Sequence, residues 1–294
     1  MKIAITGASG FIGLELIQAL LEREDIRILA LSRSERSGED CDRVAWRQTD
    51  YTVESLEAAL KDAEAVVHLA AVRGTAGCYA DYNVNEMITE NLLLAAGACG
   101  LKRVVFASSI AVYSDLEKIP WTEDMPLSPK TLYGITKASC EYLCQYYSRK
   151  YGFDPVIVRI AQVLGRGEKR RVMTNVFMDQ AAGRKELCVM GESRARRQYI
   201  YSRDLAEILS AFACGDHGPL TVNVGMEKPV SNLEVARLTN RAFGNPVPIR
   251  YDDSVKETIE PSHMNTDRLR GLLDYRPMEM EEALGQIAEE YEQG

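Results

Sequence analysis

The sequence TGASGFIG, residues 6–13, decides the fold because of what stands on either side of it. It follows the apolar run 3–5 and precedes the amphipathic segment 14–21, an order that predicts a strand, a tight turn and a helix. A glycine-rich turn in this position commonly binds a phosphate, although such turns also occur without a ligand.

Each glycine of the G-x-x-G-x-x-G pattern has a physical reason to be there. Gly7 permits a turn at positive φ, Gly10 leaves no Cβ beside a pyrophosphate, and Gly13 lets the helix lie close to the strand. The helix N-terminus, at Phe11 and Ile12, presents N–H groups and a partial positive charge to a ligand. We therefore expect these five residues to bind a dinucleotide.

The composition is that of an ordinary globular protein. Of 294 residues, 46% are hydrophobic and 27% are charged, which argues against disorder and allows a core without disulfide or metal support. The formal net charge of −8 disfavours a broad nucleic-acid role, since phosphate-tracking proteins carry excess Lys and Arg. There is no signal h-region and no apolar run of the ~18 residues that a membrane span needs. We expect neither nucleic acid nor membrane as a partner.

Cysteine and histidine usage favours a cytoplasmic protein without a metal site. The seven cysteines form no C-x-x-C pair, as is typical of reduced thiols. Cys140 and Cys144 share a helix face, where packing is favoured over a redox or metal pair. His68, His217 and His263 stand far apart and have no second ligand at zinc-site spacing.

Strands and helices alternate along the first half of the chain. The predicted strands are 26–31, 44–46, 65–71 and 104–107, and helical spacing predicts helices at 52–60 and 81–99. Short connections between them predict an α/β fold, a Rossmann-type doubly wound parallel sheet with its ligand at the carboxyl ends of the strands. We expect a dinucleotide-binding domain with the catalytic residues at 1–165. Residues 166–294 mainly form a smaller substrate-binding lobe, with some strands returning to the main sheet.

Residues at the end of the second strand bear on the choice of cofactor. A carboxylate there accepts from the ribose of NAD, whereas an arginine can hold the 2′-phosphate of NADP. This sequence has Ser32 and Arg33 and no acid, so NADP is favoured over NAD; the alternative is that Arg33 is a solvated strand-end residue. Asp50 follows the third strand, where it can meet the adenine amine. The fourth strand ends in residues that a dinucleotide would pass, namely Leu69, Ala70 and Ala71.

A tyrosine and a lysine form the sharpest chemical signal. Tyr133 and Lys137 are four residues apart and share a helix face, where the ammonium can lower a phenol pKa that starts at about 10. Such a phenol can move a proton at a carbinol or carbonyl, and a serine, Ser108 or Ser109, can orient that oxygen. A lone Tyr-x-x-x-Lys is most often a surface pair, but this one accompanies the glycine turn.

Motifs spread along the whole chain share the pattern of one known family. They are TGASGFIG (6–13), HLAA (68–71), Asn85 with Thr89 and NLL (91–93), SSIAVY (108–113), YGITK (133–137), VRIAQVLG (158–165), RQYIY (197–201) with Asp204, and NVG (223–225). With these motifs the sequence resembles the extended short-chain dehydrogenases/reductases, the NAD-dependent epimerase/dehydratase family, nearly from end to end.

The resemblance implies a chemistry and a set of roles. The chemistry is hydride transfer between nicotinamide C4 and a sugar carbon. Tyr133 would be the acid/base, with Lys137 as its tuner and a ribose ligand. Ser109, four residues before Tyr113, would be the catalytic hydroxyl, and Asn85 would belong to the cofactor site. The helices at 81–99 and 132–151 would form the contact of a homodimer.

The sequence departs from the family pattern at positions that bear on the substrate. Ile110 and Ala111 stand where 4,6-dehydratases have Asp-Glu, so a dehydratase is disfavoured. Gln162 replaces an asparagine that often contacts the diphosphate of a nucleotide-sugar, which puts UDP-sugar recognition in question. Clustered arginines suit a diphosphate, and the alternative is solvated loops that balance acidic helices. The expected substrate-binding residues are Arg73, Ser109, Gln162, Arg166 and Arg197.

The leading hypothesis is an NAD(P)-dependent oxidoreductase or epimerase that acts on a sugar carbon of a nucleotide-sugar. One alternative is an NADP-dependent reductase of a keto-sugar or of a small-molecule carbonyl. Another is a regulator that binds the dinucleotide without turnover. Intact Ser109, Tyr133 and Lys137 argue against the regulator.

Overall fold

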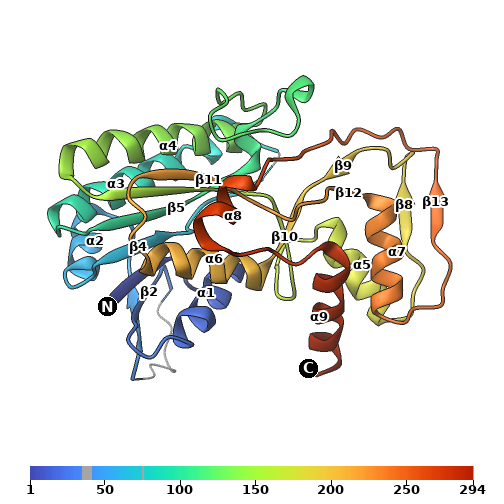
Figure 1. The fold of residues 1–294 in the computed structure, drawn as a ribbon, viewed down its shortest axis with the longest axis horizontal. Coiled ribbons are helices and arrows are strands. Elements are labelled where there is room, and N and C mark those ends of the chain that lie inside the picture. The colour runs from blue at the N-terminus through green and yellow to red at the C-terminus, as the bar shows by residue number, and fades with distance from the viewer. Residues whose placement is uncertain (35–41, 75, 294) are drawn as a thin grey trace. The chain divides into compact units, whose positions relative to one another are not determined.

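A seven-stranded sheet forms the centre of the fold (Figure 1). The computed structural model describes residues 1–34, 42–74 and 76–293. The strands of the sheet are β1 (Lys2–Thr6), β2 (Arg27–Ser32), β3 (Val44–Gln48), β4 (Ala65–His68), β5 (Arg103–Ser109), β6 (Asp154–Ile160) and β11 (Leu220–Val224). Their order is β11-β6-β5-β4-β1-β2-β3, and β1 to β6 pair in parallel. This topology confirms the predicted Rossmann-type fold.

The fourth strand is shorter than the predicted 65–71. It ends at His68, which is the partner of Thr6, the last residue of β1. Beyond that point β1 offers no further strand partner. The backbone N–H of Ala70 donates instead to the hydroxyl of Thr6 at 3.3 Å.

Helices cover both faces of the sheet. They are α1 (Phe11–Leu21), α2 (Val53–Leu60), α3 (Val84–Ala98), α4 (Leu132–Tyr151) and α6 (Ser202–Cys214). Helices α2, α3 and α4 lie on one face, and α1 and α6 lie on the other (Figure 1). Cys140 and Cys144 are fully buried in the core under α4, with Leu93 and Ile157. Short 3-10 helices are η1 (Tyr79–Asp81), η2 (Ile110–Val112) and η3 (Leu116–Lys118).

The later part of the chain forms a second apolar core from shorter elements. Its helices are α5 (Met173–Ala182), α7 (Asn232–Ala242), α8 (Asp267–Leu273) and α9 (Met280–Glu292). Its strand pairs are β7 (Gln162–Leu164) with β10 (Tyr199–Tyr201), β8 (Cys188–Met190) with β13 (Arg250–Asp252), and β9 (Arg196–Arg197) with β12 (Val230–Ser231). Residues from α5, α7 and α9, among them Phe177, Val235 and Leu284, fill this core.

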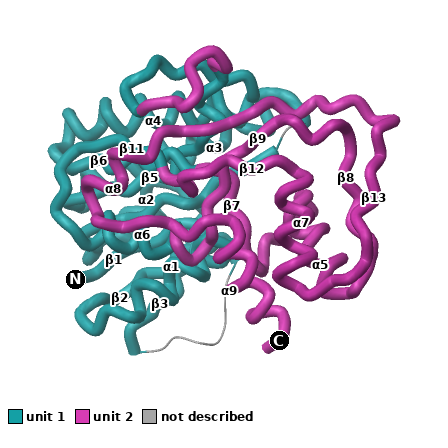
Figure 2. The backbone as a smooth tube through the Cα atoms, turned by 45° about the vertical axis from the view of Figure 1, so that its right-hand side comes forward, with its two compact units in different colours: residues 1–114, 123–160, 205–223 teal, residues 115–122, 161–204, 224–294 magenta. Residues whose placement is uncertain are grey.

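Contacts divide the chain into two compact units, which Figure 2 colours separately. Unit 1 comprises residues 1–114, 123–160 and 205–223, and unit 2 comprises 115–122, 161–204 and 224–294. The chain therefore returns to unit 1 at 205–223, where β11 joins the central sheet. Among the described residues, no helix is long and apolar enough to span a membrane.

Candidate active site

The glycine turn forms an open cradle at the N-terminus of α1. Gly7 has φ +68°, and a Cβ at Gly13 would overlap the carbonyl oxygen of Gly7. Gly10 is the N-cap of α1 and makes no side-chain cap bond. Phe11 and Ile12 open the helix, whose first turn contains no acidic residue. Since no acid of this turn neutralises the positive end of the helix, the cradle fits the pyrophosphate of a dinucleotide.

A buried tyrosine supports this turn. The hydroxyl of Tyr51 accepts a hydrogen bond from the N–H of Gly7 at 3.3 Å, and its carbonyl accepts one from the side chain of Asn91 at 2.9 Å. Its φ of 64° is rare for a bulky residue, and these bonds hold it there. Burial raises the pKa of the phenol, against the lowering effects of the Gly7 N–H and the Arg33 charge. No spacing in the sequence marks Tyr51.

The ends of β2 and β3 supply the residues predicted to meet the adenosine. The hydroxyl of Ser32 lies 3.3 Å from that of Ser9, which joins β2 to the glycine turn. Arg33 follows and is exposed. Oδ1 of Asp50 accepts from the N–H of Thr52 at 3.0 Å and from its hydroxyl at 2.8 Å, and these bonds lower the pKa of the carboxyl. One oxygen of Asp50 is thus engaged at the start of α2.

Buried His68 links β4 to β1 and α3. The hydroxyl of Thr89 donates to the carbonyl of Asn85 at 2.6 Å, so its oxygen accepts from Nε2 of His68 at 3.0 Å. Nδ1 of His68 is then the acceptor for the hydroxyl of Thr6, at 2.6 Å. Burial lowers the pKa of His68 to about 3, with a smaller effect from Lys137. The imidazole is therefore neutral and has a structural role.

Asn85 holds the segment that follows β4. Its Oδ1 accepts from the N–H of Val72 at 2.7 Å, and its Nδ2 donates to the carbonyl of Val72 at 3.0 Å. Nδ2 also donates to the hydroxyl of Thr136 at 3.2 Å, which connects this segment to α4. A Cβ at Gly7 would stand 2.9 Å from the nitrogen of Ala70, so the glycine turn and the end of β4 lie together. The partly buried residues at that end are Leu69, Ala70 and Ala71.

The predicted catalytic residues lie at the end of β5 and in the first turns of α4. The oxygen of Ser109 accepts from the N–H of Ala111 at 3.2 Å. Lys137 is 3% exposed, and its Nζ donates to the carbonyl of Ala107 at 2.6 Å. The same Nζ lies 5.8 Å from the ring centre of Tyr133, which is half-buried.

A close backbone contact brings the serine segment and α4 together. A Cβ at Gly134 would overlap the carbonyl of Ala111, so the first turn of α4 packs directly on η2. Ser109 is the N-cap of η2, and Tyr133 immediately precedes Gly134. The contact therefore places the Ser109 and Tyr133 segments next to each other. The glycine of Tyr-Gly-Ile-Thr-Lys was the available signal for it, and sequence reasoning did not use it.

The remaining predicted substrate residues lie in both units. Arg73 is exposed in unit 1. In unit 2, Gln162 is half-buried at the start of β7. Arg166 lies 5.3 Å from the ring centre of Tyr291 and donates to the carbonyl of Glu290, so its guanidinium is engaged with α9.

Arg197 has unused hydrogen-bonding capacity. It donates to Oδ1 of Asn232 at 2.8 Å and lies 5.7 Å from the ring centre of Tyr199. Its Nε is buried and has no hydrogen-bond partner among the described residues. A donor left in this state is costly unless a ligand pairs with it.

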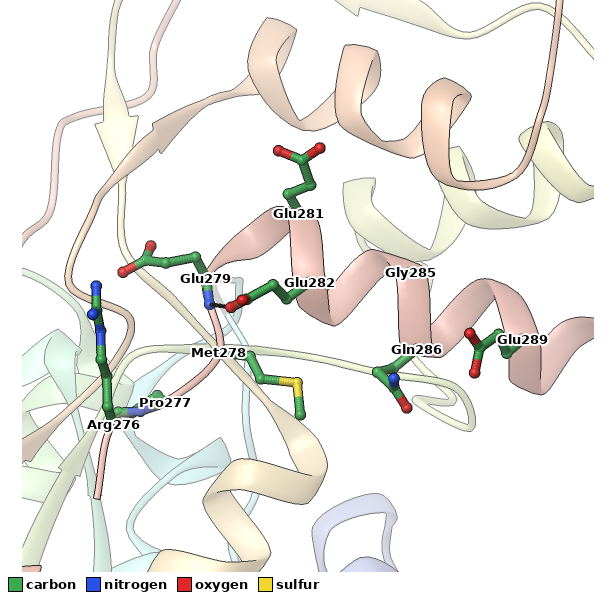
Figure 3. A pocket seen from close by; sticks show the side chains of 9 residues that line it. All are labelled: Arg276, Pro277, Met278, Glu279, Glu281, Glu282, Gly285, Gln286 and Glu289. Atoms are coloured by element: carbon green, nitrogen blue, oxygen red, sulfur yellow. Dashed lines mark hydrogen bonds between the residues drawn. The ribbon is translucent and has the colours of Figure 1, made fainter. Parts of the chain in front are cut away.

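Two of the cavities that the described residues form lie within unit 2. The larger, about 950 Å³, surrounds the start of α9 (Figure 3), and its lining includes four carboxylates, Glu279, Glu281, Glu282 and Glu289, beside Arg276. These carboxylates would repel a diphosphate. The second, about 740 Å³, includes the basic side chains Arg194, Arg196, Lys256 and His263. Arg194 and Arg196 are already paired there with Glu192 and Glu234.

The comparison with known proteins agrees with this geometry. The model of the NAD dependent epimerase/dehydratase family matches residues 3–225. The chain belongs to this family.

Three relatives illustrate the family membership. A UDP-glucose 4-epimerase of Corynebacterium glutamicum is 29% identical over 275 residues, which cover 84% of this chain and 82% of that protein. The crystal structure of UDP-N-acetylglucosamine 4-epimerase from Bacillus cereus has a TM-score of 0.90 at 32% identity and covers 99% of both chains. UDP-glucuronic acid 4-epimerase from Bacillus cereus, in complex with UDP-glucuronic acid and NAD, has a TM-score of 0.87 at 25% identity and covers 100% of this chain and 99% of that one.

The comparison with this epimerase/dehydratase family bears on the predicted preference for NADP over NAD. The last of these relatives was solved with NAD, so it gives no support to the NADP preference predicted from Arg33. The roles assigned to individual site residues stay predictions. Membership of the family itself is confirmed.

Proposed function

We propose that this epimerase/dehydratase family member inverts a ring carbon of a nucleotide-linked sugar. The observation that carries the proposal is the arrangement of Ser109, Tyr133 and Lys137 at the end of β5 and the start of α4. The three relatives named above are all UDP-sugar 4-epimerases, which supports a UDP-sugar substrate and inversion at C4.

The protein's own residues would carry the proton transfers. A bound dinucleotide supplies hydride transfer. The oxygen of Ser109 already accepts from Ala111, so its hydroxyl proton is available to a sugar oxygen. Tyr133 would take the proton of the sugar hydroxyl and return it in the reverse step. Lys137, buried and fixed by Ala107, would favour the phenolate through its charge.

The residues after Ser109 support epimerisation over elimination. Ile110 and Ala111 are the first two residues of η2 and carry no acidic or basic group. Elimination of water from a sugar needs a further acid and base beyond the tyrosine. Their absence at these two positions supports the exclusion of a 4,6-dehydratase.

We propose NAD as the cofactor, and Arg33 is the residue whose contacts decide between NAD and NADP. NAD is the cofactor in the complex of the relative from Bacillus cereus. Arg33 favours the alternative, an NADP-dependent reductase of a keto-sugar or small-molecule carbonyl, because it is exposed beside the glycine turn. Titration of NAD(H) and NADP(H) into wild type and Arg33→Ala separates the two. If Arg33→Ala loses affinity for NADP(H) alone, the result supports a contact between Arg33 and the 2′-phosphate. Equal losses of affinity for NAD(H) and NADP(H) contradict that contact.

Arg197 supports an anionic substrate. Its side chain is half-buried, and a permanently charged guanidinium suits a phosphate oxygen. Arg166 is a weaker candidate, since its guanidinium is already engaged with α9.

The direct test is a substrate panel followed by proton NMR. UDP-glucose, UDP-N-acetylglucosamine and UDP-glucuronic acid are each incubated with the purified protein. Appearance of a C4 epimer without net consumption of cofactor supports the proposal. Stoichiometric oxidation of NADPH by a ketone, with no epimer formed, supports the reductase instead. Dinucleotide binding without any turnover supports the regulator.

The exposed face of α3 and α4 supports a homodimer. Met87 on α3 and Tyr142 and Tyr146 on α4 are 55%, 61% and 55% exposed. Tyr142 and Tyr146 are four residues apart and share one face of α4, and exposed large apolar side chains are typical of an interface. Helix pairing through these two elements is the dimer contact that the family resemblance implies.

A further inference from the structure

A buried polar network stands directly behind the catalytic segment. The hydroxyl of Ser108 donates to Oε1 of Glu141 at 2.5 Å. Arg159 donates from Nε to both oxygens of Glu141, at 3.1 and 3.2 Å, and from NH2 to Oε2 at 2.8 Å. The side chains of Arg159 and Glu141 are 5% and 1% exposed. Both oxygens of the carboxylate are therefore occupied by a charged partner.

The other end of Arg159 is equally well fixed. Its NH1 donates to the hydroxyl of Tyr113 at 2.5 Å and to the carbonyl of Glu123 at 3.0 Å. The hydroxyl of Tyr113 in turn donates to Oδ1 of Asn223 at 3.0 Å. A buried guanidinium with this many partners has one available geometry.

The network touches α4 one turn beyond the catalytic lysine. Glu141 follows Lys137 by four residues, and Lys137 follows Tyr133 by four, so all three lie on one face of the helix. Opposite charges at positions i and i+4 of a helix are close enough to form an ion pair. Lys137 donates to the carbonyl of Ala107 instead, while Glu141 pairs with Arg159.

We propose that Arg159 is a positioning residue that occupies Glu141 and so leaves Lys137 at the Tyr133 side of the site. The inference rests on the proposed function for its catalytic meaning, but not for its geometry. Without Arg159, Glu141 would keep the hydrogen bond from Ser108 but would lose its charged partner, with the ammonium of Lys137 one helical turn away. The ammonium would move toward it, away from Ala107 and Tyr133.

The other ionisable groups around Lys137 do not compete for its charge. His68 on β4 is neutral, because burial lowers its pKa to about 3. Cys140 on α4 is also uncharged, since burial raises the pKa of its thiol. Glu86 on α3 acts on Cys140 and is partly exposed, with the hydroxyl of Tyr79 bonded to its carboxylate.

The structural test is a crystal structure of Arg159→Met. The inference predicts that Nζ of Lys137 leaves the Ala107 carbonyl and bonds to Glu141. An Nζ that stays on Ala107 overturns it, whatever the enzyme's substrate is. Should Arg159→Met not fold, Arg159→Lys keeps the charge but cannot engage both carboxylate oxygens, and the same displacement is expected in part.

The kinetic test uses the pair Arg159→Met and Arg159→Met/Glu141→Gln. The single variant should lose turnover at least about tenfold, and the acid limb of its kcat/KM profile should move up by as much as about one pH unit. The double variant should recover both, because the competing charge is gone. The inference is overturned if the single variant loses turnover while the acid limb of its kcat/KM profile stays in place. It is also overturned if the acid limb moves equally in both variants.

Arg103→Met is the matched control. Arg103 is a buried arginine at the start of β5, at the other end of the strand from Ser108 and Ser109. It donates to the Ala213 carbonyl and to Asp216. Its loss should lower stability and leave the pH profile unchanged. Absence of turnover of every nucleotide-sugar by the wild type would defeat the proposed function alone, since the crystallographic result is independent of it.

Discussion

His68 shows how one buried side chain connects the glycine turn to the rest of unit 1. It accepts from Thr6, the residue before Gly7, and donates to Thr89 on α3. Both ring nitrogens are committed only in the neutral form, and burial holds the pKa at about 3 against an ordinary 6.5. Protonation would leave Thr6 facing a donor, and this strains the turn that Gly7 begins.

Acid should therefore destabilise the protein through His68. Between pH 6.5 and about 3 the unfolded chain binds a proton at this residue and the folded chain does not. The contribution of His68 to the free energy of unfolding is complete above pH 6.5. Below that pH it falls by about 1.4 kcal/mol per pH unit. Urea unfolding at pH 7, 6 and 5 should show a shallower loss for His68→Gln than for wild type. Equal slopes, or an NMR titration of His68 with a midpoint near 6.5, would contradict the assignment.

The contact between α4 and η2 decides whether the predicted catalytic groups, Ser109 and Tyr133, meet. Gly134 lies in the first turn of α4, and the carbonyl of Ala111 fills the space that a side chain would need. A methyl group there would push the helix away from η2, and Tyr133 would move with the helix while Ser109 stayed with the strand.

Gly134→Ala should accordingly abolish most activity, with a stability cost of about 1–3 kcal/mol from overpacking. Gly285→Ala is the control, since Gly285 lies within α9 and a methyl group added there would meet nothing within 4 Å. Helix propensity alone should make that control slightly more stable. Thermal unfolding and epimerase assays on both variants test the contact. Full activity in Gly134→Ala would show that the close approach is not needed.

Assembly of two copies is expected to use α3 and α4. Tyr142→Glu/Tyr146→Glu places two charges on the exposed face of α4 and should convert a dimer to a monomer in light scattering. Tyr251→Glu alters a tyrosine of similar exposure, 53%, in unit 2 and should leave the mass unchanged. A wild type that is monomeric at all concentrations, or a charged variant that stays dimeric, would contradict this interface.

Much of the fold was predictable because its signals are local. Apolar runs separated by helical periodicity marked β1 to β5 of the central sheet, whereas β6 and β11 were not predicted as strands, and the glycine turn marked the start of α1. The end of β4 was misplaced by three residues, since strand length depends on where a partner strand ends. The return of 205–223 to unit 1 likewise depends on long-range contacts.

For the candidate site, the sequence could predict the residues that react but not the residues that position them. Spacing and resemblance pointed to Ser109, Tyr133 and Lys137, because these residue types define the reaction. Tyr51 gave no such signal, and Gly134 and Arg159 stand inside motifs in which they had no role assigned. Each acts through a segment distant in sequence: Tyr51 on Gly7, Gly134 on Ala111 and Arg159 on Glu141.

The role of Tyr133 can be tested with a single atom removed. Tyr133→Phe deletes the phenol oxygen and keeps the ring, so the fold and the glycine cradle should be unaffected. Turnover of the best UDP-sugar from the panel is measured together with the bound dinucleotide, released and quantified by mass spectrometry. Turnover should fall by about 10²- to 10⁴-fold while the dinucleotide content stays unchanged. Unchanged turnover in a variant that still holds its dinucleotide would contradict this role of Tyr133.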